Sequence, residues 1–306
     1  MSDYIVEEVS WNLHRETLLS IRGKVFIEEQ NVPEEIERDD KDDTATHFLL
    51  THNTVALACG RMLPDGKVGR LAVLKEHRGI GLGRLLLNYI INHARLQGMN
   101  RLYLHAQAHA ANFYLDAGFF HFGEPFEEAG IPHVAMDLEI DYSGAKEFIT
   151  HVGYPQPFAT LALALAQTAR RDLRIYSAVL DPDVFDSAEL NSAITTLARR
   201  SRHSNIRILI NDARPVVENG HRLLTLSRRL STIMKIRVLD VDEHPDLPDA
   251  TYVVRDDNGV VYKPDERGSN GFYEPDSRAS AKRFVEQFDK LWHWGEVNPR
   301  LQLLRL

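Results

Sequence analysis

Two arginines and three glycines make residues 78–84 (RGIGLGR) the strongest chemical pattern in the sequence: Arg78, Gly79, Gly81, Gly83 and Arg84. A strand-like run precedes this segment, and leucines at helical spacing follow it. Glycine lets a backbone approach a ligand closely, and the first N–H groups of a helix attract phosphate oxygens. The order of strand, loop and helix therefore predicts an anion site, although the glycine spacing alone also fits a simple tight turn.

The common nucleotide motifs fit this segment poorly. No Gly-Lys-Ser/Thr sequence completes a P-loop there. The preceding strand belongs to a meander instead of opening a βαβ unit, which disfavours a dinucleotide fold.

The surrounding pattern predicts the elements that position this loop. A charged stretch at residues 34–43 is typical of a solvated loop. The turn at Pro64, Asp65 and Gly66 predicts an antiparallel connection. Strands are expected at 4–9, 47–51, 55–62, 68–73, 102–106 and 134–140, and helices at 18–25, 85–97 and 110–117.

A length of 306 residues favours two domains, and the pattern changes at the polar, glycine-containing residues 141–144. We expect domains at 1–142 and 146–306. In the second, strands at 173–177, 206–210 and 236–241 alternate with helices at 188–200 and 220–231, which predicts an α/β domain with a mainly parallel sheet. Asn258-Gly259 predicts a hairpin, and a last helix is expected at 277–292.

Composition narrows the class of protein. The chain is 43% hydrophobic and 26% charged, as in a soluble globular protein, and its net charge of -8 argues against nucleic acid or an anionic membrane as partner. The single cysteine, Cys59, excludes an internal disulfide and a thiolate zinc site, and we expect a buried, inert thiol. With no signal-peptide pattern and no membrane-length apolar run, a cytoplasmic protein is predicted.

Several further motifs stand in a fixed order around the glycine loop: VFIEEQNVP (25–33), LHAQ (104–107), NFY (112–114), GF (118–119) and EEAGIPH (127–133). Together with Arg78, Gly81 and Gly83, they resemble the ElaA-like branch of the GNAT acetyltransferase superfamily over residues 1–140. The resemblance implies a mixed, mostly antiparallel sheet splayed at its centre, with flanking helices. It also implies acetyl-CoA as acyl donor, and a small-molecule or protein amine as acceptor.

The same resemblance implies which residues bind the donor. The backbone of Leu71, Ala72 and Val73 would face the pantetheine arm, and residues 78–84 would hold the pyrophosphate. Tyr114 stands where many GNAT enzymes keep a tyrosine that protonates the leaving thiolate. Asn112 would contact the pantetheine or the carbonyl, although asparagine near a helix start is as often a cap.

Transfer to an amine also needs a general base. His47, His105, His133, Glu28 and Glu29 all suit that role by residue type, and none is fixed by spacing. We keep His105 and Glu29 as the candidates beside Tyr114. A chain of water molecules could replace any of them.

The second half weakly resembles a degenerate phospholipase D-like domain. The nearest counterpart of that family's His-x-Lys motif is His221-Arg222-Leu223, which has leucine in place of lysine. We therefore favour an accessory domain for acceptor recognition or homodimerisation. Arg199, Arg200, Arg202 and His203 form a basic cluster that is more typical of a solvated helix end than of a nucleic-acid patch.

Three functions stay open at this point. The first is an N-acetyltransferase that moves an acetyl group from acetyl-CoA to a primary amine by direct attack on the thioester. The second is an acetyl-CoA sensor with little turnover. The third is a phosphodiesterase-like or nucleic-acid-binding protein that acts through the second domain.

Overall fold

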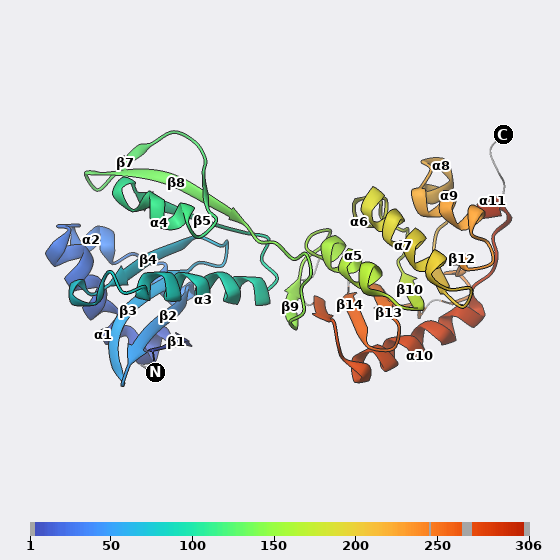
Figure 1. The fold of residues 1–306 in the computed structure, drawn as a ribbon, viewed down its shortest axis with the longest axis horizontal. Coiled ribbons are helices and arrows are strands. Elements are labelled where there is room, and N and C mark those ends of the chain that lie inside the picture. The colour runs from blue at the N-terminus through green and yellow to red at the C-terminus, as the bar shows by residue number, and fades with distance from the viewer. Residues whose placement is uncertain (1–3, 245, 265–270, 303–306) are drawn as a thin grey trace. The chain divides into compact units, whose positions relative to one another are not determined.

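The computed structural model describes residues 4–244, 246–264 and 271–302. Contacts within the chain group into two compact units, one of residues 1–95 with 99–141 and the other of residues 96–98 with 142–306 (Figure 1). The α/β fold class is confirmed in both units. No helix in the described ranges is both long and apolar enough to cross a bilayer.

The N-terminal unit contains two antiparallel sheets. The first has the order β1-β2-β3-β4, and its strands are β1 (Tyr4–Val9), β2 (Thr46–His52), β3 (Val55–Met62) and β4 (Val68–Val73). The second has the order β5-β8-β6, with β7 also paired to β8, and its strands are β5 (Arg101–Gln107), β6 (Phe120–His121), β7 (Phe126–Glu128) and β8 (Ile131–Glu139). The predicted meander is confirmed.

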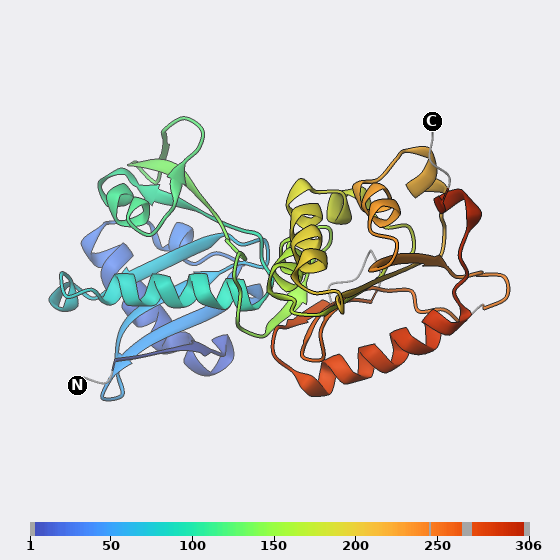
Figure 2. The same cartoon turned by 45° about the vertical axis from the view of Figure 1, so that its right-hand side comes forward.

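Helices cover both faces of the first sheet. Along β2, Phe48 and Leu50 pack with residues of α3 (Leu82–Leu96), whereas Leu49 packs with residues of α1 (Trp11–Arg22). Successive side chains of the strand point to opposite faces of the sheet, and on each face they pack against the apolar side of one helix. Figure 2 shows α3 lying across the strands. The remaining helical segments are η1 (Gly23–Glu29, π-helical), α2 (Glu34–Glu37), η2 (Asp42–Thr44), η3 (Lys75–His77), η4 (Ala108–Ala110) and α4 (Ala111–Leu115).

The C-terminal unit is built on one seven-stranded sheet of order β12-β11-β10-β13-β14-β15-β9. Its strands are β9 (Ile149–Val152), β10 (Asp172–Tyr176), β11 (Asn205–Ile210), β12 (Met234–Val238), β13 (Thr251–Arg255), β14 (Gly259–Lys263) and β15 (Gly271–Glu274). The sheet is mixed. β10, β11 and β12 are parallel as predicted, whereas the pairings of β13 with β10, β14 with β13, β15 with β14 and β9 with β15 are antiparallel. The Asn258-Gly259 hairpin reverses the chain between β13 and β14.

Helices lie on both faces of this sheet. α10 (Arg278–Trp294) packs Phe284 and Phe288 on Tyr252 and Val254, while α5 (Phe158–Thr168), α7 (Ala188–Arg200) and α9 (Arg222–Arg229) lie on the other side (Figure 2). Short helices complete the unit: α6 (Pro182–Phe185), α8 (Arg214–Glu218) and α11 (Pro299–Gln302).

Candidate functional site

The two sheets of the N-terminal unit meet at one point and then diverge. The backbone N–H of Tyr103 donates to the carbonyl oxygen of Gly66 at 3.1 Å, and Lys67 forms a parallel bridge with Tyr103. Gly66 has φ +87°, and a Cβ there would lie 2.5 Å from the carbonyl oxygen of Arg101. Glycine is therefore required at this junction. In the described residues, β4 and β5 share no ladder beyond it, so one edge of β4 is open to a ligand.

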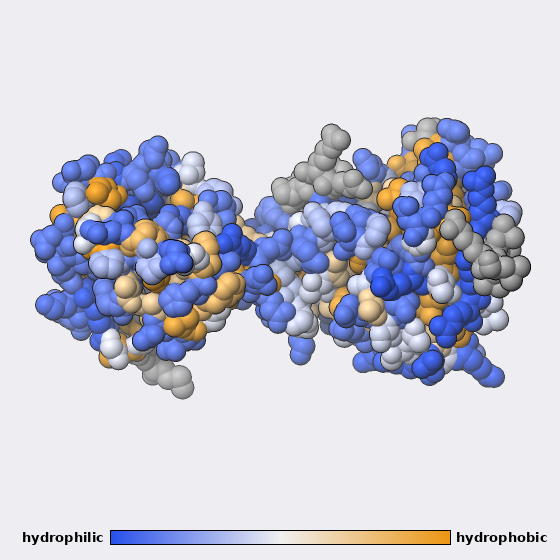
Figure 3. Space-filling view, turned by 90° about the horizontal axis from the view of Figure 1, so that it is seen from above, coloured by the Kyte–Doolittle hydropathy of each residue, from blue (hydrophilic) through white to orange (hydrophobic). Residues whose placement is uncertain are grey.

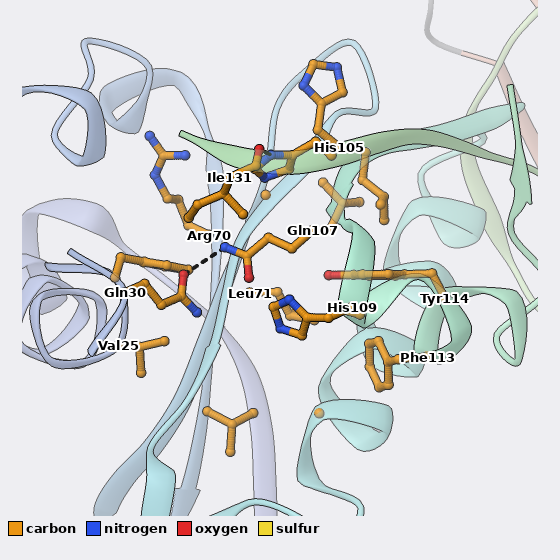
Figure 4. A pocket seen from close by; sticks show the side chains of 18 of the residues that line it. Val25, Gln30, Arg70, Leu71, His105, Gln107, His109, Phe113, Tyr114 and Ile131 are labelled. Atoms are coloured by element: carbon orange, nitrogen blue, oxygen red, sulfur yellow. Dashed lines mark hydrogen bonds between the residues drawn. The ribbon is translucent and has the colours of Figure 1, made fainter. Parts of the chain in front are cut away.

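A cleft of about 660 Å³ fills this opening (Figure 4). It brings together nine of the predicted site residues: Leu71, Val73, Arg78, Gly79, Gly81, Gly83, Arg84, His105 and Tyr114. The sequence motifs therefore converge on one place although they are spread over 44 positions of the chain, from Leu71 to Tyr114.

The glycine loop borders the cleft. Gly81 has φ +91°, and a Cβ built there meets no atom within 4 Å, so the loop borders open space. Arg78 is held by Glu29 (Nη2 to Oε2, 2.8 Å) and by the carbonyl of Val73 (Nε to O, 2.8 Å). Arg84 donates to the carbonyl of Asp116 at 2.8 Å. The first turn of α3 follows and leaves N–H groups without intrahelical acceptors.

Three predicted site residues do not line the cleft, and each has a physical reason. Glu29 directs its carboxylate to Arg78, so it positions that arginine. The side chain of Ala72 is buried in the core beside α1, because side chains alternate along β4. Asn112 is exposed on α4. The structure thus places the carboxylate of Glu29 on Arg78 and the side chain of Asn112 outside the cleft, and their roles stay predictions.

Two other candidate bases also lie outside the cleft. Glu28 is exposed and does not line it. His47 is buried, stacks on Trp11 with ring centroids 4.7 Å apart, and has Nε2 2.8 Å from the carbonyl oxygen of Asp42. Burial is the main cause that lowers the pKa of His47. His47 is thus a structural, neutral histidine.

Tyr114 reaches the cleft from α4. Its ring makes edge contacts with Phe113 and Phe119, at centroid distances of 4.9 and 5.9 Å. Figure 4 shows its hydroxyl directed into the cleft toward Leu71, with His109 beside it. Burial raises the pKa of Tyr114 to about 12, so the hydroxyl keeps its proton at neutral pH. The group is available as a proton donor.

His105 forms a pair with Glu128, which the sequence analysis did not single out. Nδ1 of His105 lies 3.0 Å from Oε2 of Glu128, and the His105 ring packs edge-on against Phe126. Burial would raise the pKa of Glu128, but the hydrogen bond from His105 and the charges of His105, His133 and Lys67 lower it overall. An ionised carboxylate only accepts, so Nδ1 carries the proton and Nε2 of a neutral imidazole keeps its lone pair.

A hydrogen bond spans the cleft between two residues that sequence reasoning missed. Nε2 of Gln107, at the end of β5, donates to Oε1 of Gln30 at 2.8 Å (Figure 4). Both glutamines stand inside the quoted motifs, yet no local pattern shows that they meet. His133, the remaining candidate base, also lines the cleft, with Nδ1 2.8 Å from the carbonyl oxygen of Ile131.

The charged stretch 34–43 is exposed at most of its residues, as predicted, but it contains the short helix α2 and two buried acids that the prediction of a solvated loop missed. Glu37 and Asp42 are 2% and 5% exposed, because buried arginines neutralise them. Arg22 bonds both oxygens of Asp42 (2.9 and 3.0 Å) and also the carboxylate of Glu37. This contact holds α2, whose Ile36 lines the cleft, against the rest of the unit.

Two further arginines complete this buried network. Arg61 bonds Asp39 and Asp42, each at 2.6 Å from Nη1. Burial would raise the pKa of Asp39, but Arg61 outweighs it and lowers that pKa to about 2. Arg70 donates to the carbonyls of Ile36 (2.8 Å) and Glu37 (3.1 Å). Three arginines thus balance three carboxylates behind one wall of the cleft.

Arg70 also marks an irregularity in β4. The pairing with β3 shifts register, so that Gly60 stands opposite both Arg70 and Leu71, and Arg70 has φ +52°. Such a bulge leaves one residue unpaired and re-aims the backbone beside it. The irregular backbone therefore lies in the part of β4 that borders the cleft.

In the C-terminal unit, His221 has a structural contact of its own. It stands at the N-cap of α9, where Nδ1 accepts a hydrogen bond from the backbone N–H of Leu223 at 3.1 Å. Its side chain is 2% exposed. The histidine that the sequence offered for a phosphodiester motif thus caps a helix.

Comparisons with known proteins find relatives for both halves of the chain. The GNAT acetyltransferase domain model matches residues 3–140, and a domain of unknown function (DUF7931) matches residues 154–304. The uncharacterized protein YyaT of Bacillus subtilis is 37% identical over 128 residues, which are 40% of this chain and 86% of YyaT. ElaA of Escherichia coli is 34% identical over 131 residues, 40% of this chain and 86% of ElaA. The crystal structure of Escherichia coli ElaA covers 45% of this chain and 100% of its own, at 30% identity and a TM-score of 0.41.

The homologues of the N-terminal half indicate an acyltransferase. The chain belongs to the GNAT acetyltransferase family through its N-terminal half, as its resemblance to ElaA predicted.

Proposed function

We propose that this protein is an N-acetyltransferase that moves an acetyl group from acetyl-CoA to a primary amine. The observation that carries the proposal is the free edge of β4, which leads directly into the glycine loop before α3. A strand edge suits the amide groups of a pantetheine arm, and the loop with its helix start suits a pyrophosphate. The N-terminal unit of an acidic chain would thus bind a polyanion through local donors.

The donor's binding residues follow from the lining of the cleft. The backbone of residues 71–73 would pair with the pantetheine arm. Arg78, Gly79, Gly81, Gly83 and Arg84 would surround the pyrophosphate. Ala72 would contribute through its backbone alone, since its side chain is buried in the core.

The reaction needs three groups, and the cleft offers a candidate for each. Nε2 of His105, oriented by Glu128, would take the proton from the attacking amine. The irregular backbone at Arg70 and Leu71 would polarise the thioester carbonyl. As the new C–N bond forms and the C–S bond breaks, Tyr114 would donate its proton to the departing thiolate. This is direct attack, with no acyl-enzyme intermediate.

Calorimetric titration with acetyl-CoA tests the donor assignment. We expect one saturable site, and a Gly81→Val variant should bind about tenfold more weakly or worse, because φ is positive and the new side chain enters the open space of the loop. Gly123→Val is the matched control, since Gly123 also has positive φ and open surroundings but does not line the cleft. No saturable heat at millimolar acetyl-CoA would reject the donor.

The base assignment predicts a pH-dependent defect. In a screen of primary amines, His105→Gln should lower kcat/KM about 10²-fold at neutral pH, and the deficit should shrink at high pH as the free amine accumulates. Glu128→Gln should show the same trend with a smaller loss, because the imidazole keeps a hydrogen-bond acceptor but loses the charge. His133→Gln is the discriminating variant. If it shows the pH-dependent loss and His105→Gln does not, the base is His133.

The other functions give different outcomes in these experiments. Saturable acetyl-CoA binding without thiol release on any amine would favour a sensor. For the second half, we propose an accessory domain at residues 146–306, with a catalytic domain at 1–142. The helix-capping role of His221 supports this over a phosphodiesterase. Acceptor recognition or homodimerisation is the role that we propose for it, in a cytoplasmic protein.

A further inference from the structure

The C-terminal unit has a second cavity, a groove of about 780 Å³ between α9, the edge of β12 and α11. Met234 and Ile236 of β12 line its base but are only 1% and 7% exposed, and Val297 and Leu301 line the other side. Val297 is 53% exposed, which is high for a valine in a folded domain. Figure 3 shows apolar surface exposed among hydrophilic side chains on this unit. The groove is distinct from the acyl-transfer cleft.

One wall of the groove is an edge strand. β12 is the outermost strand of its sheet and pairs with β11 on one side. On the other side, in the described residues, only Val238 has a partner, with mutual backbone bonds to Glu296 of 2.8 and 2.9 Å. The backbone from Met234 to Arg237 is therefore open along this edge. Such an edge is a template for an added strand.

The side chains that line the groove carry charge of one sign, although the exposed Glu296, which pairs with Val238 at the end of this edge, is acidic. Residues 219–239 contain five basic residues and no acidic one. Four of the five line the groove: Arg228, Arg229, Lys235 and Arg237. No carboxylate lies among the lining residues.

These cations lack carboxylate partners in the described ranges. Arg228 donates to the carbonyl of Leu301 at 2.8 Å, and Arg237 donates to the carbonyl of Trp292 at 2.7 Å while it lies over that ring. Arg229 and Lys235 are exposed and make no recorded contact. The groove thus combines one exposed valine, an open strand edge and positive side chains without carboxylate partners.

We propose that this groove binds an acidic, extended segment of a partner protein, which adds to β12 as a strand. Its backbone would pair with residues 234–237, its apolar side chains would lie against the exposed Val297, and its carboxylates would reach Arg229 and Lys235. A second copy of the same groove would bring like charges together. Residues 303–306 of this chain carry one arginine and no acid, so they lack the matching charge.

Fluorescence anisotropy with the full chain tests the proposal. The probe is a labelled octapeptide of alternating glutamate and valine. We expect saturable binding that weakens several-fold between 50 and 200 mM NaCl, and at least tenfold in the double variant Arg229→Glu, Lys235→Glu. Arg199→Glu is the matched control, because Arg199 is equally exposed but lies outside the groove. It should change affinity less than twofold.

Several results would overturn the proposal. One is a double variant that binds the peptide with the same affinity as the parent protein while circular dichroism shows that it is folded. If it does not fold, Arg229→Gln with Lys235→Gln takes its place. Another is equal binding of a peptide whose valines are replaced by proline, because proline cannot pair along an edge. A third is stronger binding of a single-stranded oligonucleotide or of phosphatidylserine vesicles that depends on the same two residues.

Discussion

Replacing Tyr114 with phenylalanine is expected to lower kcat about 10²-fold or more while the affinity for acetyl-CoA changes less than twofold. The aromatic ring keeps its contacts with Phe113 and Phe119, so the variant removes only the hydroxyl. Within the described residues that hydroxyl makes no hydrogen bond, and it points into the cleft (Figure 4). Its loss should therefore leave folding and donor binding intact and remove the proton that the thiolate receives.

The pKa of Tyr114 adds a second expectation. Because burial raises it to about 12, the hydroxyl stays protonated well above neutral pH, and its ionisation should not produce a falling limb in the rate profile between pH 7 and 10. A fall within that range that disappears in Tyr114→Phe would show instead that the group ionises earlier, in a less buried setting than the structure has.

The release of free thiol, assayed with an amine identified by screening, measures kcat. Calorimetric titration with acetyl-CoA measures the affinity for the donor. Tyr89→Phe is the matched control, since Tyr89 packs on the same core and makes an edge contact with Phe48 at 5.9 Å, outside the cleft. A kcat for Tyr114→Phe within twofold of the parent would assign this ring to packing alone and leave protonation of the thiolate to His109 or to water.

The sequence predicted helices and turns well where a signal within a few residues, such as a helix cap or a turn motif, determines them. The helix expected at 188–200 begins and ends at those residues, because Ser187 caps it and accepts a hydrogen bond from the backbone N–H of Leu190 at 3.1 Å. The Asn258-Gly259 hairpin was found because its signal lies within two residues. The glycine loop was found for the same reason.

Contacts between distant segments could not be predicted in this way. The charged stretch 34–43 looks solvated because the arginines that neutralise its acids stand far away in the chain, Arg22 before it and Arg61 after it. Glu128 reaches His105 across 23 positions, and Gln107 reaches Gln30 across 77. A glutamate such as Glu29 can act as a general base, but only the fold shows that its carboxylate forms a salt bridge with Arg78. Residue type indicated the chemistry, and tertiary contacts decided which residue could perform it.

The buried ion network leads to the second large expected effect. Arg22→Ala should lower the free energy of unfolding of the N-terminal unit by about 3–5 kcal/mol, because it leaves carboxylates buried without their partner. Arg22 is 1% exposed and serves two acids at once, Glu37 and Asp42. Arg61 still contacts Asp42 at 2.6 Å, but Nε of Arg70 is 3.6 Å from the carboxylate of Glu37 and cannot replace the lost bond.

Urea unfolding measures this loss, with Arg15→Ala as the matched control. Arg15 lies on the same helix and carries the same charge, but it is exposed, so its removal should change the unfolding free energy by about 0.5 kcal/mol or less. Since α2 forms a wall of the cleft, Arg22→Ala should also raise the KM for the amine while the affinity for acetyl-CoA, set by the loop at residues 78–84, stays the same. Equal stability of Arg22→Ala and Arg15→Ala would mean that water or a rearranged Arg61 compensates the buried carboxylates, and that α2 is held by its apolar contacts instead.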